Sequence, residues 1–346
     1  MKKKLFAAFA TMALAFTSAQ TANALELSGI AYVQGHGGHV AVVDLATGAV
    51  GKFQHDKPSD AVTVSKDGKT LYNFSLDGYA KEIDVDSGKQ TEWTKLGQKH
   101  CGSNLAPDGT IWVSDMKDGK TYIYDPKTHK LVDSFETAKS TCGINFSKDG
   151  KYAYISDMPG GFVAVVDVAT KKVVSKINNV GNFIHRAEVT RDGSELWQSE
   201  GNELAAGTAI GVGYAAAGAS AGGISIVDLK SGKVKDFILT GGNPHDVTFT
   251  PDGKYAIAAV RQLPEQDDSA LVVINTDTKR IVKIYSACKS CHGVQDVTIP
   301  EDNDGGRPFL CGVDVDWNRK AMPQGAEMET KAQALSKTSP GCAELK

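Results

Sequence analysis

Cys288, Cys291 and His292 stand in the motif Cys-Lys-Ser-Cys-His, towards the C-terminal end of the sequence. The pattern CxxCH is typical of covalent c-type haem attachment, because the two thiols reach the haem vinyl groups and the adjacent imidazole binds the iron. A haem held in this way transfers electrons. We therefore expect Cys288 and Cys291 to carry a c-type haem, with His292 as its proximal iron ligand.

Other chemistry is open to the same residues. Cys288 and Cys291 would also form a local disulfide, or bind a metal ion together with His292. A distal ligand on the iron would favour electron transfer, and an open distal position would favour small-molecule chemistry. The sequence does not choose among the possible distal ligands, which are Met158, His185, His245 and Met322.

A second group of candidate ligands is spaced regularly along the chain. Each member lies seven positions before the aspartate of an Asp-Gly pair: Asp60, Cys101, Cys142, His185 and His245. Thiols and imidazoles at equivalent positions would face a common axis, as copper or zinc ligands, distal haem ligands or acid–base groups. The alternatives are a Cys101–Cys142 disulfide between neighbouring repeats and side chains that only satisfy the backbone. In the last, irregular repeat the equivalent position is Gln295.

The Asp-Gly pairs themselves mark an internal repeat. They follow one another at intervals of 41, 41, 43 and 60 residues, and the long interval contains a Gly/Ala-rich insertion at residues 202–222. Each repeat holds short β-type runs between turn residues, such as Lys151–Ile155 and Val163–Asp167. Four strands in about 42 residues are typical of a propeller blade. We expect an all-β fold, a β-propeller of four-stranded blades, seven in number, with six as the alternative count.

This architecture relates the two groups of residues. In a propeller, the link from an outer strand to the next inner strand lies on the face where the inner strands begin. The CxxCH motif follows the outer-strand run Arg280–Tyr285, so we place it in such a link. A haem at Cys288 and Cys291 would then stand over the channel mouth that carries Cys101, Cys142, His185 and His245.

The two ends of the chain have their own signals. The N-terminus combines basic Lys2–Lys4, the apolar run Leu5–Phe16 and small residues up to Ala24, which is the pattern of a secretory signal peptide. Elsewhere no segment offers the roughly 20 apolar residues of a membrane-spanning helix. We expect a signal peptide at 1–24, a β-propeller at 25–320 and a C-terminal tail at 321–346, in a periplasmic protein.

The remaining cysteines and histidines receive structural roles. Cys311 and Cys342 are expected to pair as a disulfide that holds the tail, because disulfides form readily in exported proteins. His55 and His129 are expected on the surface.

The net charge of the chain and its lack of some familiar motifs limit the possible functions. The formal charge is −3, and loss of the three signal-peptide lysines makes it about −6, which argues against a nucleic-acid or anionic-membrane partner. The chain has no HExxH motif and no phosphate-binding glycine loop. Whether the protein is an enzyme stays open, with an oxidoreductase as the candidate class. The expected partner is a periplasmic redox protein or a small-molecule substrate.

Over roughly residues 28–317 the repeat resembles the periplasmic YVTN-type β-propellers. The likeness rests on Val-Ala-Val-Val-Asp at 163–167, on Ser-Gly-Lys-Val at 231–234 and on the Ser-x-Asp-Gly-Lys-x-x-Tyr turn at 147–154. This family includes the haem d1-binding domain of cytochrome cd1 nitrite reductases and related d1-haem biogenesis proteins. In cytochrome cd1 the c-type haem is on a separate helical domain, whereas here the CxxCH motif follows a propeller strand.

Together these observations predict a periplasmic electron-transfer protein with a c-type haem at the channel face and a Cys/His-lined centre at the channel mouth. The alternatives are a haem-free propeller that binds copper or zinc through the Cys/His group, and a scaffold that docks another periplasmic protein.

Overall fold

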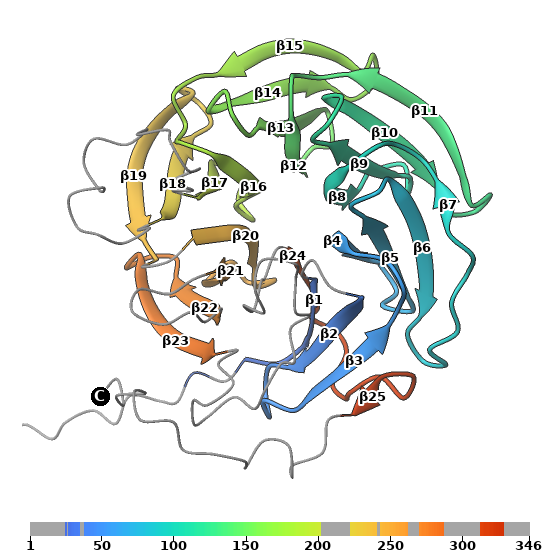
Figure 1. Ribbon diagram of the computed structural model, residues 1–346. Coiled ribbons are helices and arrows are strands. Elements are labelled where there is room, and N and C mark those ends of the chain that lie inside the picture. The colour runs from blue at the N-terminus through green and yellow to red at the C-terminus, as the bar shows by residue number, and fades with distance from the viewer. Residues whose placement is uncertain are drawn as a thin grey trace, which may run out of the picture.

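The structure, a computed structural model, describes residues 25, 27–34, 38–201, 222–240, 243–261, 270–286 and 312–328. The expected signal peptide, the CxxCH motif, Cys311 and Cys342 lie outside these residues. Within the described ranges the strands form six sheets, arranged as blades around a central axis (Figure 1). The chain is therefore an all-β propeller with the lower of the two expected blade numbers.

Blades two to six each use four consecutive antiparallel strands, ordered from the axis outwards. Blade two consists of β4 (Ser59–Val64), β5 (Thr70–Ser75), β6 (Tyr79–Asp84) and β7 (Thr94–Lys95). Blade three consists of β8 (His100–Leu105), β9 (Ile111–Asp115), β10 (Lys120–Asp125) and β11 (Lys130–Glu136). Blade four consists of β12 (Thr141–Phe146), β13 (Tyr152–Asp157), β14 (Phe162–Asp167) and β15 (Lys172–Ile177). Blade five consists of β16 (Ile184–Val189), β17 (Glu195–Glu200), β18 (Gly223–Asp228) and β19 (Lys233–Leu239). Blade six consists of β20 (Asn243–Phe249), β21 (Tyr255–Arg261), β22 (Ala270–Asn275) and β23 (Arg280–Ser286).

Blade one joins the two ends of the chain and closes the ring. Its strand order is β24 (Gly312–Asp316), β1 (Ile30–Gln34), β2 (His39–Asp44), β3 (Val50–Gln54) and β25 (Glu327–Met328). The C-terminal strand β24 pairs antiparallel with β1 and supplies the innermost position. It completes the first blade instead of starting a seventh. The innermost strand of this blade thus begins at Gly312, and Gln295, the position expected from the register, lies outside the described residues.

Aspartates at the ends of third strands hold the turns that follow. The Asp44 carboxylate accepts the N–H of Ala46 at 2.8 Å, and the Asp228 carboxylate accepts that of Ser231 at 2.7 Å. The chain then passes through a glycine in the left-handed region, with φ of +73° at Gly48. Glycine adopts this conformation without a Cβ penalty. This explains why Asp44, at the end of a third strand, is followed by a glycine, Gly48, in the same turn.

Tryptophans on second strands fill the spaces between neighbouring blades. Trp112 of blade three meets Phe146 on the inner strand of blade four, with ring centroids 5.2 Å apart. Trp197 of blade five meets Phe249 of blade six in the same way, at 5.1 Å. Both contacts are edge-to-face, a geometry that contributes about 0.5–1.5 kcal/mol beyond the buried area. Equivalent aromatic pairs thus join blade three to blade four and blade five to blade six.

One of the two histidines expected on the surface is buried. His129 is half exposed and lies 2.9 Å from Glu82, as expected of a surface residue. His55 is only 7% exposed, because it follows the outer strand β3 directly and is covered by the edge of the Trp93 ring. Burial lowers the pKa of His55 to about 3.

Candidate functional site

Local irregularities on the inner strands set the positions of the Cys/His group. In blades two to six the pairing of the inner strand with its neighbour shifts near the strand start, at Asp60, Cys101–Gly102, Cys142–Gly143, His185–Arg186 and His245. Such bulges change the direction of a side chain relative to the regular pleat. All five residues chosen from the sequence register therefore occupy bulged positions at the same end of the inner strands.

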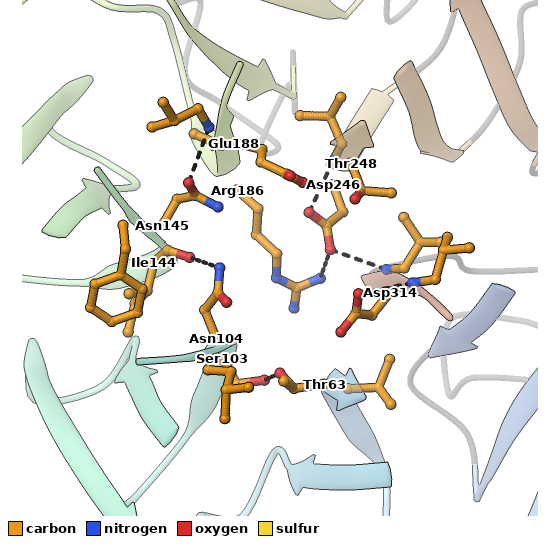
Figure 2. Close-up of a pocket in the computed structure, with 18 of the residues that line it drawn as sticks. Thr63, Ser103, Asn104, Ile144, Asn145, Arg186, Glu188, Asp246, Thr248 and Asp314 are labelled. Carbon is orange, nitrogen blue, oxygen red and sulfur yellow. Dashed lines mark hydrogen bonds and ion pairs between the residues drawn. The ribbon is translucent and has the colours of Figure 1, made fainter. Parts of the chain in front are cut away.

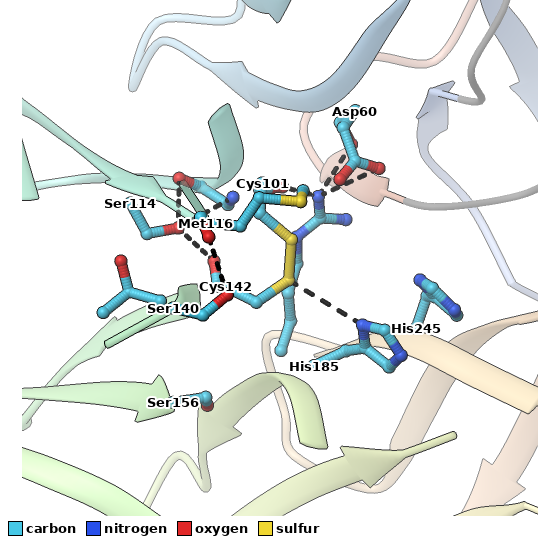
Figure 3. Close-up of a disulfide and its surroundings, with 12 residues drawn as sticks. Asp60, Cys101, Ser114, Met116, Ser140, Cys142, Ser156, His185 and His245 are labelled. Carbon is cyan, nitrogen blue, oxygen red and sulfur yellow. Dashed lines mark hydrogen bonds and ion pairs between the residues drawn. A yellow bond between two sulfur atoms is a disulfide. The ribbon is translucent and has the colours of Figure 1, made fainter. Parts of the chain in front are cut away.

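Two of these residues form a disulfide between neighbouring blades. Cys101 on β8 and Cys142 on β12 are bonded, with Cα atoms 4.7 Å apart (Figure 3). Both side chains are buried. The Sγ atom of Cys142 lies 3.8 Å from Nδ1 of His185. The inter-blade disulfide was one of the two alternatives for this pair, and the structure confirms it.

His185 connects the disulfide to the fourth residue of the group. The two sulfur atoms and one ring nitrogen of His185 all lie within 4.8 Å of one another. The His245 ring stacks on the His185 ring, with centroids 3.6 Å apart. The structure thus brings Cys101, Cys142, His185 and His245 together, but among the described residues only the first three offer ligand atoms at metal-binding separation.

Glycines let the inner strands approach closely at this level. A Cβ atom on Gly102 would collide with the carbonyl oxygen of Cys142. A Cβ atom on Gly143 would lie 2.6 Å from Cα of Arg186, which is closer than carbon atoms pack. The Cys-Gly pair, repeated at 101–102 and 142–143, is a sequence signal for this close approach that the register analysis did not use.

Arg186 lies between the disulfide and the rest of the channel. Its Nη2 atom donates to the carbonyl oxygen of Asp60 at 2.7 Å and also to the carbonyl oxygen of Cys101. Its Nη1 atom is 3.5 Å from Oδ2 of Asp246, and Nη2 is 3.7 Å from Oδ1 of Asp60. The side chain is buried, so the two carboxylates supply the compensation that a buried cation requires.

Beyond Arg186 the channel holds a polar cavity of about 380 Å³ (Figure 2). Its walls come from the second halves of the six inner strands. One side carries carboxyl groups from three consecutive blades, and the other side carries amides and hydroxyls. The carboxyls belong to Glu188, Asp246 and Asp314, and the facing groups to Thr63, Ser103, Asn104 and Asn145.

Burial makes these three carboxyl groups weaker acids than carboxyl groups in water. It raises the pKa of Glu188 to about 7, against the opposing effect of Arg191, whose Nη1 is 2.9 Å from Oε1. Burial also raises the pKa values of Asp246 and Asp314 to about 6. Backbone N–H groups of Val313 and Val64 donate to these two carboxyls and lower their pKa values in turn. The cavity can therefore bind or release protons close to neutral pH.

Sequence reasoning missed this cavity. Glu188 and Asp314 each stand between two apolar residues, Asp246 stands between a histidine and a valine, and the three form no motif. The inner-strand register would have placed Glu188 three positions after His185, on the same strand. Without the close packing of six strands around one axis, nothing in the sequence distinguishes them from surface acids.

The structure describes the candidate distal haem ligands but not the residues of the CxxCH motif. Cys288, Cys291 and His292 fall between β23, which ends at Ser286, and β24, which begins at Gly312. A Cβ atom on Gly312 would lie 2.8 Å from Nη1 of Arg186, so β24 starts beside the Cys/His group. Among the distal-ligand candidates, His185 and His245 lie at this end of the channel. Met322 instead packs against the core between blades one and two.

Comparisons with known proteins support the fold. No family model matches the chain. The WD repeat-containing protein SL1-17 of Schistosoma mansoni is 27% identical to the chain over 176 residues. The match covers 50% of this chain and 50% of the length of that protein. Hydrazine synthase of Kuenenia stuttgartiensis is similar in structure, with a TM-score of 0.51 and 20% identity, over 73% of this chain and 70% of that one. At this identity the likeness shows the propeller fold alone. Among the described residues no helix is long and apolar enough to cross a membrane.

Proposed function

We propose that the protein is a periplasmic electron-transfer protein with a c-type haem attached to Cys288 and Cys291. His292 would bind the iron from one side. When bound, such a haem supplies a one-electron couple. The Cys/His group of Cys101, Cys142, His185 and His245 would lie beneath it as a second centre.

One observation carries this proposal. The outer strand β23 ends at Ser286, and the next described strand, β24, begins at Gly312, which borders Asp60 and Arg186 at the end of the channel that holds the Cys/His group. The CxxCH motif stands between these two points in the sequence. The resemblance to YVTN-type propellers, which include haem d1-binding domains, supports the same function and the periplasmic location. The partner would be a periplasmic redox protein or a small molecule in the polar cavity, whose volume lies in the range of small-ligand sites.

The test is expression of the full chain in a bacterium that matures c-type cytochromes. We expect haem that stays on the polypeptide in a denaturing gel, and that is lost in Cys288→Ser/Cys291→Ser. Cys101→Ser/Cys142→Ser is the matched control and should keep its covalent haem. Exported wild-type protein without covalent haem would contradict the proposal.

A haem-free copper or zinc protein is the second candidate. It is favoured by one observation, the separation of at most 4.8 Å among the ligand atoms of Cys101, Cys142 and His185. Metal analysis of protein prepared without haem separates the two candidates. The copper or zinc function requires bound metal in that protein, whereas the haem function does not.

A further inference from the structure

We propose that reduction of the Cys101–Cys142 disulfide opens a binding site for one copper(I) ion. Its ligands would be the Sγ atoms of Cys101 and Cys142 and the Nδ1 atom of His185. The inference is independent of the proposed haem function, because a c-type haem would use Cys288, Cys291 and His292 instead, and it rests on the copper or zinc site of the second candidate.

The geometry brings the three ligand atoms close to their final positions. A metal–sulfur bond is about 2.3 Å long and a metal–nitrogen bond about 2.0–2.1 Å, so two ligands of one ion are separated by at most about 4.6 Å. The three atoms already lie within 4.8 Å of one another. In the disulfide, however, the sulfur atoms are bonded to each other and cannot act as thiolates. Reduction and small side-chain rotations are sufficient to form the site.

The ligand set selects the metal. Two thiolates and one imidazole are soft donors, which favour copper(I) and zinc over calcium, magnesium or manganese. Structural zinc sites are almost always closed by four ligands in a tetrahedron. The part of the chain that the structure describes gives three, since His245 is stacked on His185 and is not a member of the group within 4.8 Å. Three soft donors without a fourth favour copper(I).

The surroundings favour thiolates at this point. The guanidinium of Arg186 donates to the carbonyl oxygen of Cys101, which places a positive charge beside the cysteine pair. A nearby arginine stabilises a thiolate relative to the neutral thiol. Cys101, Cys142 and His185 are all buried, so water competes poorly for the ion. Burial also means that the reductant that reaches the disulfide is a small molecule.

The reduction of the disulfide and the binding of copper balance without a change in the oxidation state of the metal. The disulfide accepts two electrons and two protons from a small dithiol, which is itself oxidised to a disulfide. Each of the two thiols then loses its proton as its sulfur binds the ion. Copper enters as copper(I) and stays in that state. In the reverse direction a small-molecule disulfide takes two electrons from the two thiolates and two protons from solution and becomes a dithiol, and copper(I) is released as the Cys101–Cys142 disulfide forms again.

The experiment uses the full chain with Cys288→Ser/Cys291→Ser, which removes haem absorption and two competing thiols. The protein is reduced with dithiothreitol without oxygen, desalted and titrated with copper(I) against a chromophoric copper(I) chelator. We expect one copper(I) per chain, with an affinity at least 100-fold above that of the same protein carrying Cys101→Ser/Cys142→Ser. Protein kept in the disulfide form should not show this uptake. X-ray absorption should give two sulfur ligands and one nitrogen ligand.

His185→Ala keeps both cysteines and provides a second variant if the double serine variant folds poorly. We expect it to weaken copper(I) binding at least tenfold, whereas the exposed His129→Ala leaves binding unchanged. Equal uptake by the Cys101→Ser/Cys142→Ser protein would place copper on Cys311 or Cys342 and overturn the proposal. Tighter binding of zinc than of copper(I), with four ligands, would overturn the choice of metal. Haem attachment in wild-type protein is scored separately, so the two proposals fail independently.

Discussion

The imidazole of His185 lies over that of His245, with ring centroids 3.6 Å apart and planes inclined by 27°. The two rings come from inner strands of neighbouring blades, and both histidines occupy bulges in strand pairing. His185 is therefore held on one side by a ring and on the other by the sulfur of Cys142, at 3.8 Å. This arrangement orients one nitrogen of His185 towards the cysteine pair.

The stack predicts different effects for two substitutions of His245. His245→Ala removes the ring that orients His185, and we expect copper(I) affinity to fall by roughly tenfold, as is typical for a residue that supports a metal ligand. His245→Phe keeps a flat ring without nitrogen atoms and should retain most of the affinity. Chelator competition on the reduced protein measures both. If His245→Phe loses as much as His245→Ala, His245 is itself a ligand.

Arg186 predicts a large effect on stability. Arg186→Met leaves the buried carboxylates of Asp60 and Asp246 without their cation, and breaking a buried pair in this way costs about 3–5 kcal/mol in the free energy of unfolding. Lys171→Met is the matched control, because Lys171 and its partner Asp133 are both exposed and such a pair contributes about 1 kcal/mol or less. Urea unfolding measures both. Equal losses in the free energy of unfolding of the two variants would show that Arg186 does not compensate the buried carboxylates of Asp60 and Asp246.

The repeat predicted more of the site than the individual motifs did. Counting seven residues back from each Asp-Gly pair identified Asp60, Cys101, Cys142, His185 and His245, and all five stand at bulges at one end of the channel. Register succeeds here because the inner strand and the Asp-Gly turn after it keep the same spacing in blades two to six. The register does not extend to the closing blade, whose innermost strand β24 joins strands from the start of the chain, and Gln295 lies outside the described residues.

The chemistry between these residues was not predictable from register. Equivalent positions indicate that side chains share an axis, but not whether two cysteines are bonded or which histidine is close to them. Those details depend on the glycines after Cys101 and Cys142, which let three strands approach. His55 shows the same limit, since its burial depends on contact with Trp93 of another blade.

The disulfide predicts a measurable contribution to stability. It closes a loop with a sequence separation of 41 residues, and a cross-link of this length stabilises a fold by about 2–4 kcal/mol, mainly by restricting the unfolded chain. We expect Cys101→Ser/Cys142→Ser to lower the free energy of unfolding by this amount. Comparison in urea with and without dithiothreitol measures the difference. The reductant should destabilise the wild-type protein and have less effect on the variant, and equal sensitivity would contradict the prediction.

The cavity carboxyls predict how stability depends on pH. The folded-state pKa of Glu188 is about 7 and those of Asp246 and Asp314 are about 6, all above their ordinary values near 4. Between about pH 4 and pH 7 the folded protein therefore binds more protons at these groups than the unfolded chain does. Their contribution to stability is complete at the acidic end of this window and is lost as the pH rises through 6 to 7.

Glu188→Gln isolates this effect, because glutamine keeps the shape of the side chain without an acidic group. Buried His55 and His100 have lowered pKa values and act in the opposite direction below about pH 6.5, so variant and wild type are compared at each pH. We expect the variant to gain about 1–2 kcal/mol relative to wild type between pH 5.5 and pH 8, measured by urea unfolding. Glu92→Gln, an exposed site, should show no such change. A constant difference between wild type and Glu188→Gln across this range would mean that Glu188 is already ionised at pH 5.5.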